Sequence, residues 1–576
     1  MSDSADQPAT GPPRPSRRPR VGTLIAAALL SVGVLSLGLT PVRTDHDVFW
    51  HLKTGQVIVE NGWRLPHTDP FTYGSEDVVW HNHEWLTQIA MFGFHRLGAA
   101  TLRVEGLDHA DAQAGMRMVV LAKALLLLAA FGFVARTMTR QGVCAIAACG
   151  VVLLAAMASR WTIHCRPPVV TYLFLAVMLL SLTRHWPRRH PIAASFAALF
   201  HFALWSNLHG GWLAGLVVLG CWIAGDIWWL LVHRWKGEGL RAVLDDRRLR
   251  AHALIFVAAL IGTLINPAGW HLYGLTLRVM SASELIARIP EMMPPRFPEH
   301  WPLFVLLVTA AVALVVSLFR PGVVRPAEGF AMLFFAWQAL SHMRHAPLFA
   351  IVAAVPIGRM LQLYIDWWAK RMSARALAGV MLLKMLILTL FLLFGITGKP
   401  LGHGNRLIWE PYAPRNIRWF RGLGYEPTHY QDAACDHLLL AEAPGRLWTN
   451  LNIGGFMIWR LSPEPYRVYT DSRFDVHGDA RQILEDSING LDPRPDWDAV
   501  LADLGVNVAV LEKATPLVQL MMQSPGWTAV HEWTAPGHSW RDGTMTFIRA
   551  TPENAGAIER ALQLARRMGE APLGAP

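Results

Sequence analysis

Charged residues are scarce in this chain. Of its 576 residues, 16% are Asp, Glu, Lys or Arg and 53% are hydrophobic, whereas a soluble protein of this length would have about 25% charged residues. The deficit comes from long apolar runs of the kind that cross a bilayer. The composition therefore predicts a polytopic membrane protein with enough chain left for a soluble domain.

Cysteine and several common motifs are scarce or missing too. The chain has 5 Cys and no C-x-x-C pair, which argues against a disulfide framework and a zinc site. It contains no G-x-G-x-x-G, G-K-S, G-K-T, H-E-x-x-H or G-x-S-x-G sequence. A nucleotide site, a zincin and a serine hydrolase are therefore unsupported.

Acidic residues are outnumbered by basic ones, 42 to 52, and the net charge is +10. Such a balance can indicate nucleic-acid binding. Here, however, Arg and Lys cluster in short loops between apolar runs, as orientation in a membrane requires. We therefore expect membrane lipids as partners and no nucleic acid.

Apolar windows predict about eleven membrane spans. Residues 1–20 are rich in Pro and Ser and end in basic residues, which predicts a disordered cytoplasmic tail. No A-x-A site follows the first apolar run, so we expect that run to be an uncleaved signal anchor. The expected spans lie near residues 22–40, 116–135, 142–158, 169–183, 192–206, 211–232, 251–266, 303–319, 327–343, 346–365 and 377–397.

Loop charge predicts the orientation. With the N-terminus in the cytoplasm, every inward loop is basic, as the positive-inside rule requires. The first loop, residues 41–115, then faces outward together with everything after about residue 398. We expect a transmembrane domain over 21–397 and an extracytoplasmic α/β domain over 398–576. The inward loops are 136–141, 183–190, 233–250, 319–326 and 366–375.

Short segments in the tail predict a small α/β domain. Apolar residues 85–98 of the first outer loop are too few to span a bilayer, and they predict an amphipathic helix in the interface. Helices are expected at 497–505, 515–526 and 553–569, and strands at 447–451, 467–471, 506–511, 527–533 and 545–550.

Residues 45–86 crowd acidic, histidine and tryptophan side chains beside the end of the first apolar run. Asp45 and Asp47 form D-H-D here, and either could be a general base for an acceptor hydroxyl or amine. If this stretch begins a helix, Asp47 and His51 lie one turn apart and could hold a divalent cation. Capping explains most such Asp pairs, but the membrane setting favours function.

Other outer-loop residues are candidate substrate ligands. Glu84, in H-N-H-E-W-L, could orient His51 or a substrate hydroxyl, or could only cap a helix. Arg166 and Arg344 could grip a lipid-linked phosphate, or could only anchor headgroups or pair with a carboxylate. His209, in N-L-H-G-G, could face the outer cavity or be a packed polar residue. The complete candidate set is His51, His83, Glu84, His209, Arg166, Arg344 and His345.

These motifs resemble the GT-C superfamily of integral membrane glycosyltransferases, in a bacterial branch distantly like the protein O-mannosyltransferases. Members of that branch show D-x-D-x-W-W-H-L-x-x-G, P-x-x-D-P-F-S-Y and W-x-x-H-E-W-L. This chain has D-H-D-V-F-W-H-L-K-T-G (45–55), P-H-T-D-P-F-T-Y (66–73) and W-H-N-H-E-W-L (80–86). Phe49, Thr72 and Phe456 depart from the pattern, and none of them removes an ionisable group. The resemblance continues at 207–211, 266–270, 344–350, 452–459 and 469–473.

The resemblance implies a GT-C-like fold, a sugar donor linked to polyprenyl phosphate, and a first-loop acid as catalytic base. We carry that role over to Asp45 or Asp47. The expected activity is transfer of the sugar to a glycan, lipid or protein acceptor at the outer face of the bacterial cytoplasmic membrane. No cofactor is certain, and a divalent cation is left open.

Two other functions remain as alternatives. A transporter or flippase for a lipid-linked substrate would place ionisable groups near the bilayer midplane and often contain internal repeats. Here no repeat is visible, and the charges lie at span ends. A non-catalytic protein of envelope polysaccharide assembly would leave the acidic first loop unexplained.

Overall fold

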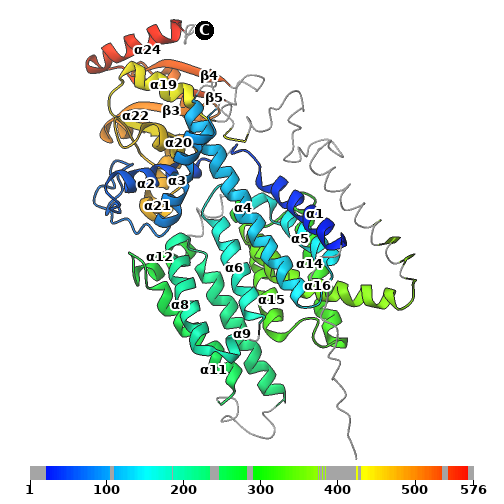
Figure 1. Cartoon of the computed structure of the whole chain (residues 1–576). Helices are drawn as coiled ribbons and strands as arrows, with labels where there is room; N and C mark the ends of the chain where they lie inside the picture. Colours follow the sequence, from blue (N-terminus) through cyan, green and yellow to red (C-terminus); the bar gives the residue numbers. More distant parts are fainter. Residues whose placement is uncertain are drawn as a thin grey trace, which may run out of the picture.

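The computed structural model shows a bundle of apolar helices with a tail built around a β-sheet beyond one end (Figure 1). The predicted tail 1–20 and almost all of the predicted span 377–397 lie outside the described residues. The structure describes residues 21–567 except for 44, 104–108, 185, 234–244, 282–289, 374, 377–378, 381–382, 384–422, 426–429 and 535–542.

Helices occupy each of the first ten predicted spans. Six of those described are long and apolar enough to cross a membrane: α1 (Val21–Gly38), α4 (Ala110–Arg140), α8 (Pro191–Leu208), α9 (Trp212–His233), α14 (Trp301–Phe319) and the continuous segment Met343–Ala369. That segment joins η3 (Met343–His345) to α16 (Ala346–Ala369). The chain is therefore a polytopic helical membrane protein. Shorter helices fill the remaining predicted positions: α5 (Ala145–Ala158), α6 (Pro168–Leu182), α11 (Arg247–Thr263) and α15 (Pro326–Ser341).

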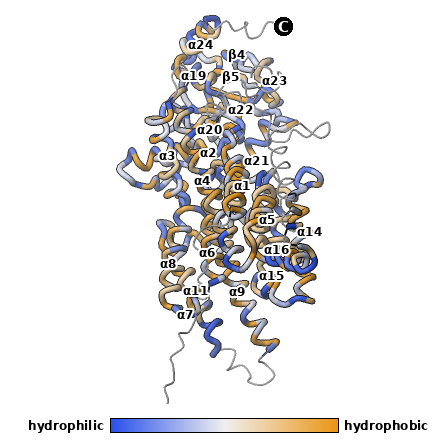
Figure 2. Tube along the Cα trace, turned by 45° about the vertical axis from the view of Figure 1, so that its right-hand side comes forward, coloured by the Kyte–Doolittle hydropathy of each residue, from blue (hydrophilic) through white to orange (hydrophobic). Residues whose placement is uncertain are grey.

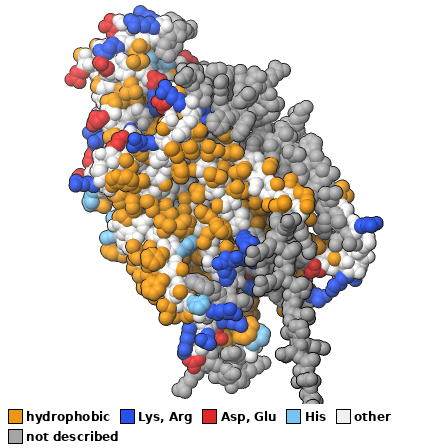
Figure 3. Space-filling model, viewed as in Figure 1, with side chains coloured by type: hydrophobic (Ala, Val, Ile, Leu, Met, Phe, Trp, Pro, Cys, Tyr) orange, Lys and Arg blue, Asp and Glu red, His pale blue; other side chains and the backbone are white. Residues whose placement is uncertain are grey.

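The surface of the helical part is apolar. Figure 2 shows that hydrophobic residues concentrate along these helices, and Figure 3 shows a broad hydrophobic belt across one face, with Lys and Arg gathered below it. Phe200, Val308 and Leu333 are examples of large side chains that stay exposed there. A contiguous apolar surface of this kind suits lipid rather than water.

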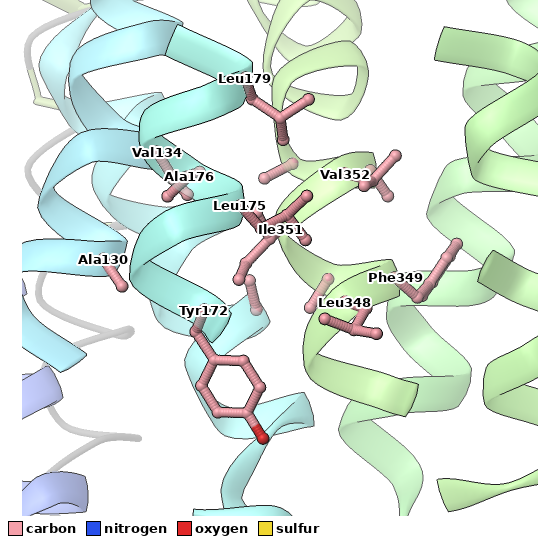
Figure 4. Packing of buried hydrophobic residues seen from close by; sticks show 14 of the residues in the cluster. Ala130, Val134, Tyr172, Leu175, Ala176, Leu179, Leu348, Phe349, Ile351 and Val352 are labelled. Carbon is pink, nitrogen blue, oxygen red and sulfur yellow. The ribbon is translucent and has the colours of Figure 1, made fainter. Parts of the chain in front are cut away.

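Close packing holds the helices together. Leu175 of α6 and Ile351 of α16 are fully buried and lie near each other in the core (Figure 4). Where backbones approach closely, small residues are needed. A Cβ added to Gly225 of α9 would come within 2.5 Å of the Ala327 backbone, and one added to Gly262 of α11 within 2.4 Å of Leu199 O. Short elements connect the bundle: η1 (Arg160–Thr162), α7 (Trp186–Arg189), α12 (His271–Ser281) and η2 (Pro290–Met292).

The loop 41–115, predicted to face outward, contains two helices, α2 (Asp47–Glu60) and α3 (Trp85–Thr101). The predicted helix 85–98 is therefore present, and it packs against α2 and α4. Gly55 permits the contact with α2, because a Cβ there would lie 2.2 Å from Gln88 O. The D-H-D motif lies at the start of α2, so Asp47 begins a helix as the sequence allowed.

The tail is an α/β unit around a five-stranded sheet. The strands are β1 (Arg446–Thr449), β2 (Arg467–Val468), β3 (Val506–Glu512), β4 (Trp527–Thr534) and β5 (Gly543–Arg549), in the order β2-β1-β3-β5-β4. β1 is parallel to β2 and β3, whereas β5 is antiparallel to β3 and β4. All five predicted strands are confirmed. The helices are α19 (Asp432–Ala441), α20 (Leu451–Leu461), α21 (Phe474–Asn489), α22 (Trp497–Asp503), α23 (Pro516–Gln523) and α24 (Ala555–Arg567), with η5 (Pro552–Asn554) before α24.

The first outer loop and the tail share one hydrophobic core. Phe49 of α2 makes edge contacts with Tyr425, Tyr430 and Phe456, with ring centroids 4.8–5.6 Å apart. Single β-bridges join the loop to the tail backbone as well, between Thr72 and Val468 for example. In Figure 1, α2, α3 and α21 accordingly lie between the sheet and the membrane helices. The loop therefore contacts both the membrane helix α4 and the tail.

Candidate active site

One guanidinium joins the two acidic residues of D-H-D. Arg166, which follows η1 in the chain, donates from Nε to Asp45 Oδ1 at 2.5 Å, and its Nη1 lies 2.8 Å from Asp47 Oδ2. The same Nη1 lies 3.6 Å from Glu291 Oε1 of η2. Two predicted catalytic residues and one predicted substrate ligand therefore form a single charge cluster with a third carboxylate.

The two carboxylates of D-H-D differ in environment. The Asp45 side chain is 6% exposed and that of Asp47 is 21% exposed. Burial works to raise the pKa of Asp45, but the charge of Arg166 and the nearby His164 hold it below its usual value. Burial raises the pKa of Asp47, and repulsion from Asp45 adds to the rise, which outweighs the effect of Arg166. Asp47 is thus the more accessible and the more basic of the pair.

Asp45 has an oxygen that faces the interior of the cluster. Its Oδ2 is buried and accepts no hydrogen bond from the described residues, although His164 Nδ1 lies 3.9 Å away. The other face of the residue is held by the tail, since the Tyr430 hydroxyl donates to Asp45 O at 3.5 Å. This geometry suits a residue that orients Arg166 from a fixed backbone.

A second cluster surrounds Glu84, the predicted ligand of the H-N-H-E-W-L motif. Three imidazole nitrogens approach its carboxylate: His51 Nδ1 at 3.8 Å, His83 Nε2 at 3.8 Å and His209 Nε2 at 3.6 Å. Gln88 Nε2 also lies 3.4 Å from His51 Nδ1. Four of the predicted substrate ligands are therefore brought together.

Two imidazoles of this second cluster, those of His51 and His209, are held neutral. Burial and the neighbouring positive groups lower the pKa of both His51 and His209 well below its usual value. His209 Nδ1 accepts the Gly211 backbone N–H at 2.9 Å, so its proton lies on Nε2, which points toward Glu84. A carboxylate among neutral imidazoles offers donors and acceptors to an uncharged polar ligand, such as a sugar hydroxyl.

Arg344 lies in η3, next to the segment that carries Glu291. Its Nη1 donates to the Met292 thioether at 3.2 Å, which is a weak acceptor. Among the described residues, no carboxylate or carbonyl accepts from this guanidinium. His345 is less closely connected: its ring centroid is 6.0 Å from that of His342, and no described contact joins it to either cluster.

Asp47 and His51, the two residues predicted to hold a divalent cation if one binds, have different neighbours. Asp47 faces Arg166 and Ser472, whereas His51 faces Gln88 and Glu84. Within the part of the chain that the structure describes, no group of three His, Cys, Asp or Glu side chains is arranged to hold a metal ion. The positive charge among the carboxylates is that of Arg166.

Three site residues were not among the sequence candidates: His164, Glu291 and Ser472. His164 has a visible signal, because it is two residues from Arg166 in the same predicted loop. Ser472 belongs to Y-T-D-S-R, which the sequence marks only as part of a resemblance. Glu291 follows a segment without any motif, and only the fold brings it to Arg166.

No family model and no curated protein matches this chain. Solved structures do match. The oligosaccharyltransferase of Archaeoglobus fulgidus in its apo form aligns at 12% identity and a TM-score of 0.52, over 85% of this chain and 69% of that one. The same protein, tethered with an acceptor peptide containing the NVT sequon via a disulfide bond, aligns at 13% identity and a TM-score of 0.53 over the same shares.

ArnT from Cupriavidus metallidurans, bound to undecaprenyl phosphate, aligns at 16% identity over 92% of this chain and 99% of that one, with a TM-score of 0.47. The likeness to the oligosaccharyltransferase shows that the two proteins share a fold, which in the described part of this chain is a bundle of apolar helices with a sheet-containing tail.

Proposed function

We propose that this protein is a membrane glycosyltransferase that moves a sugar from a polyprenyl-phosphate donor to a glycan, lipid or protein hydroxyl or amine. The observation that carries the proposal is the Asp45–Arg166–Asp47 cluster, in which a residue between η1 and α6 joins two acidic residues of the loop 41–115. Such a cluster combines a base with a fixed positive charge, which are the two groups that transfer from a phosphate-linked donor needs.

We assign the base to Asp47. It is the more exposed carboxylate, and its raised pKa makes it a stronger base than an ordinary Asp. The acceptor oxygen or nitrogen attacks the anomeric carbon, and its proton passes to Asp47. The bond from that carbon to the phosphate oxygen breaks, and its electron pair leaves with the lipid phosphate. Asp45 keeps Arg166 in place.

Arg344 supplies a cation for the departing phosphate. Its guanidinium has only a thioether as acceptor among the described residues, so a phosphate can take that place without breaking an ion pair with a described residue. The cluster of Glu84 and its three histidines binds sugar or acceptor hydroxyls. Its His51 lies on the next turn of α2 after Asp47, which puts hydroxyl recognition beside the base.

The protein is expected to act in the cytoplasmic membrane of a bacterium, with the first outer loop and the tail on the periplasmic or extracellular side. The test compares a deletion strain with the same strain carrying the wild-type protein, by mass spectrometry of polyprenyl-linked sugars and surface glycans. We expect one lipid-phosphate sugar to accumulate in the deletion strain and one sugar to disappear from a glycan, lipid or protein. Identical profiles in the two strains would reject the proposal.

We further propose that transfer needs no divalent cation, because Arg166 already pairs with one oxygen of each carboxylate that would otherwise bind one. Purified protein in proteoliposomes should therefore keep its transfer rate in EDTA, within about twofold. The control is Arg166→Gln, which removes the guanidinium and so leaves the three carboxylates without the positive charge that stands in for a divalent cation. A loss of wild-type activity in EDTA that Mg²⁺ or Mn²⁺ restores would contradict this expectation.

A further inference from the structure

A hydrogen-bond relay runs from α2 through the tail and back to α2. Trp50 Nε1 donates to Ser472 Oγ at 3.2 Å, and the Ser472 hydroxyl donates to Asp47 Oδ1. An indole N–H can only donate, and a serine hydroxyl has a single proton. Since Trp50 occupies a lone pair of Ser472, the hydroxyl proton is directed at Asp47.

The backbone that carries Ser472 is held on both sides. Its neighbours Asp471 and Arg473 are fully buried and paired, and Arg473 N donates to Asp471 Oδ1 at 2.9 Å. The chain also rests directly on α20, because a Cβ added to Gly454 would lie 2.5 Å from Thr470 O. The backbone of Ser472 is therefore held in place, which fixes the point from which its hydroxyl reaches Asp47.

The next residue of α20 fixes the other partner. A Cβ added to Gly455 would lie 2.4 Å from His46 O and 3.2 Å from Trp50 Cδ1. The glycine pair of N-I-G-G-F (452–456) thus lets α20 touch both the D-H-D segment and the Y-T-D-S-R segment (469–473). Sequence motifs far apart in the chain therefore meet at this helix, and together they hold the Asp47 carboxylate in place.

We propose that the tail is part of the catalytic site, with Ser472 as the positioning residue that aims Asp47 at the acceptor. This inference rests on the function proposed above. Asp47 Oδ1 is held by Ser472 and Oδ2 by Arg166, so both oxygens are oriented before substrate binds. The charged groups that face Asp47 are Arg166, Asp45 and Glu291.

Asp47 has two different contacts, one from Arg166 and one from Ser472. Arg166 also pairs with Asp45 and Glu291, whereas the Ser472 hydroxyl donates to Asp47 only. A hydrogen bond donated to the ionised form of a carboxylate favours that form. Removal of the Ser472 hydroxyl should therefore make Asp47 harder to ionise, and the protein should need a higher pH to work.

The experiment measures the pH profile of transfer for wild type, Ser472→Ala and Ser472→Thr in proteoliposomes. With Ser472→Ala, we expect the acidic limb of kcat/KM to move up by about one pH unit. At a fixed pH on the acidic limb, the rate of Ser472→Ala should therefore be about tenfold below that of wild type, with KM for the donor unchanged. Ser472→Thr keeps the hydroxyl and should restore the wild-type profile. Ser487→Ala is the matched control, since Ser487 is a tail serine that donates to Leu484 O.

A second readout does not depend on activity. A carbodiimide modifies carboxyl groups in their protonated form, and mass spectrometry can follow the fragment that carries Asp47 as a function of pH. The labelling midpoint of Asp47 should rise with Ser472→Ala and stay in place with Ser487→Ala.

Unchanged labelling and an unchanged pH profile in Ser472→Ala would overturn the inference, even if wild type transfers sugar and Asp47→Asn does not. If wild type transfers no sugar, the proposed function fails. The labelling shift then decides separately whether Ser472 sets the state of Asp47.

Discussion

Asp47→Asn is expected to lower the sugar-transfer rate by about 10²–10⁴-fold, which is the usual contribution of a general base. Asparagine has nearly the shape of aspartate and can still accept the Ser472 hydrogen bond. It cannot take the acceptor proton. We therefore expect kcat to fall, while binding of the lipid-linked donor changes little. The measurement is steady-state transfer in proteoliposomes with a polyprenyl-phosphate sugar.

The assignment of Asp47 as the base also predicts how the wild-type transfer rate depends on pH. The base works only when ionised, so wild-type kcat/KM should increase as the pH rises through the raised pKa of Asp47 and then level off. In Asp47→Asn this limb should disappear from the residual rate. If the substrate itself titrated in this range, the limb would persist in the variant.

Asp45→Asn and Asp496→Asn separate the assignment from its alternatives. Asp45 binds Arg166 through Nε, so Asp45→Asn should slow transfer but keep the rising limb. Asp496 belongs to an exposed pair with Arg494, and its change to asparagine should alter neither rate nor profile. Full activity in Asp47→Asn with loss in Asp45→Asn would move the base to Asp45. Full activity in both would leave the cluster without a catalytic role.

Local patterns in the sequence predict most of the elements but few of the contacts. Short segments in the tail located all five of its strands, and apolar runs located the helices of the membrane part. The helix α20 was not predicted. Its glycine pair opposes helix formation by about 1 kcal/mol for each residue, and only the contacts at His46 and Asp471 explain why glycine is needed there.

The candidate site shows the same division. The crowding of acids in D-H-D marks Asp45 and Asp47 from the sequence alone, and the basic outer-loop residue Arg166 is a reasonable phosphate ligand on that basis. Its pairing with both acids, and the presence of Glu291, depend on how η1 and η2 pack against the start of α2. Such long-range pairing has no local signal, because no periodicity relates residues more than one hundred positions apart.

The tail and the first loop are joined by a buried ion network, which was also invisible in the sequence. Arg473 is 0% exposed and lies 2.8 Å from Asp69 Oδ1 and 2.6 Å from Asp471 Oδ2. His477 Nε2 adds a contact of 3.0 Å to Asp471. The guanidinium also lies over the Trp80 and Phe71 rings, 4.9 and 5.1 Å from their centroids. Arg473 therefore links the P-H-T-D-P-F segment of the loop to the Y-T-D-S-R segment of the tail.

Arg473→Ala is expected to destabilise the joined loop and tail by about 3–5 kcal/mol, because it leaves two buried carboxylates without their cation. Burial acts to raise the pKa of Asp471, but Arg473 and His477 hold it far below its usual value. With a lowered folded-state pKa, this residue stabilises the fold above the unfolded Asp pKa, about 3.9. The contribution is lost as the pH falls below that value. Wild type should therefore lose stability in acid more steeply than Arg473→Ala.

Denaturant unfolding of the purified protein in detergent measures both effects. Arg494→Ala is the matched control, since Arg494 forms an exposed pair with Asp496, and such pairs contribute little. We expect it to unfold like wild type. If Arg473→Ala also unfolded like wild type, the network would not hold the loop to the tail. Because Ser472 lies between Asp471 and Arg473, a partly unfolded Arg473→Ala should also lose the Ser472 contact to Asp47. Its transfer rate should then fall together with its stability.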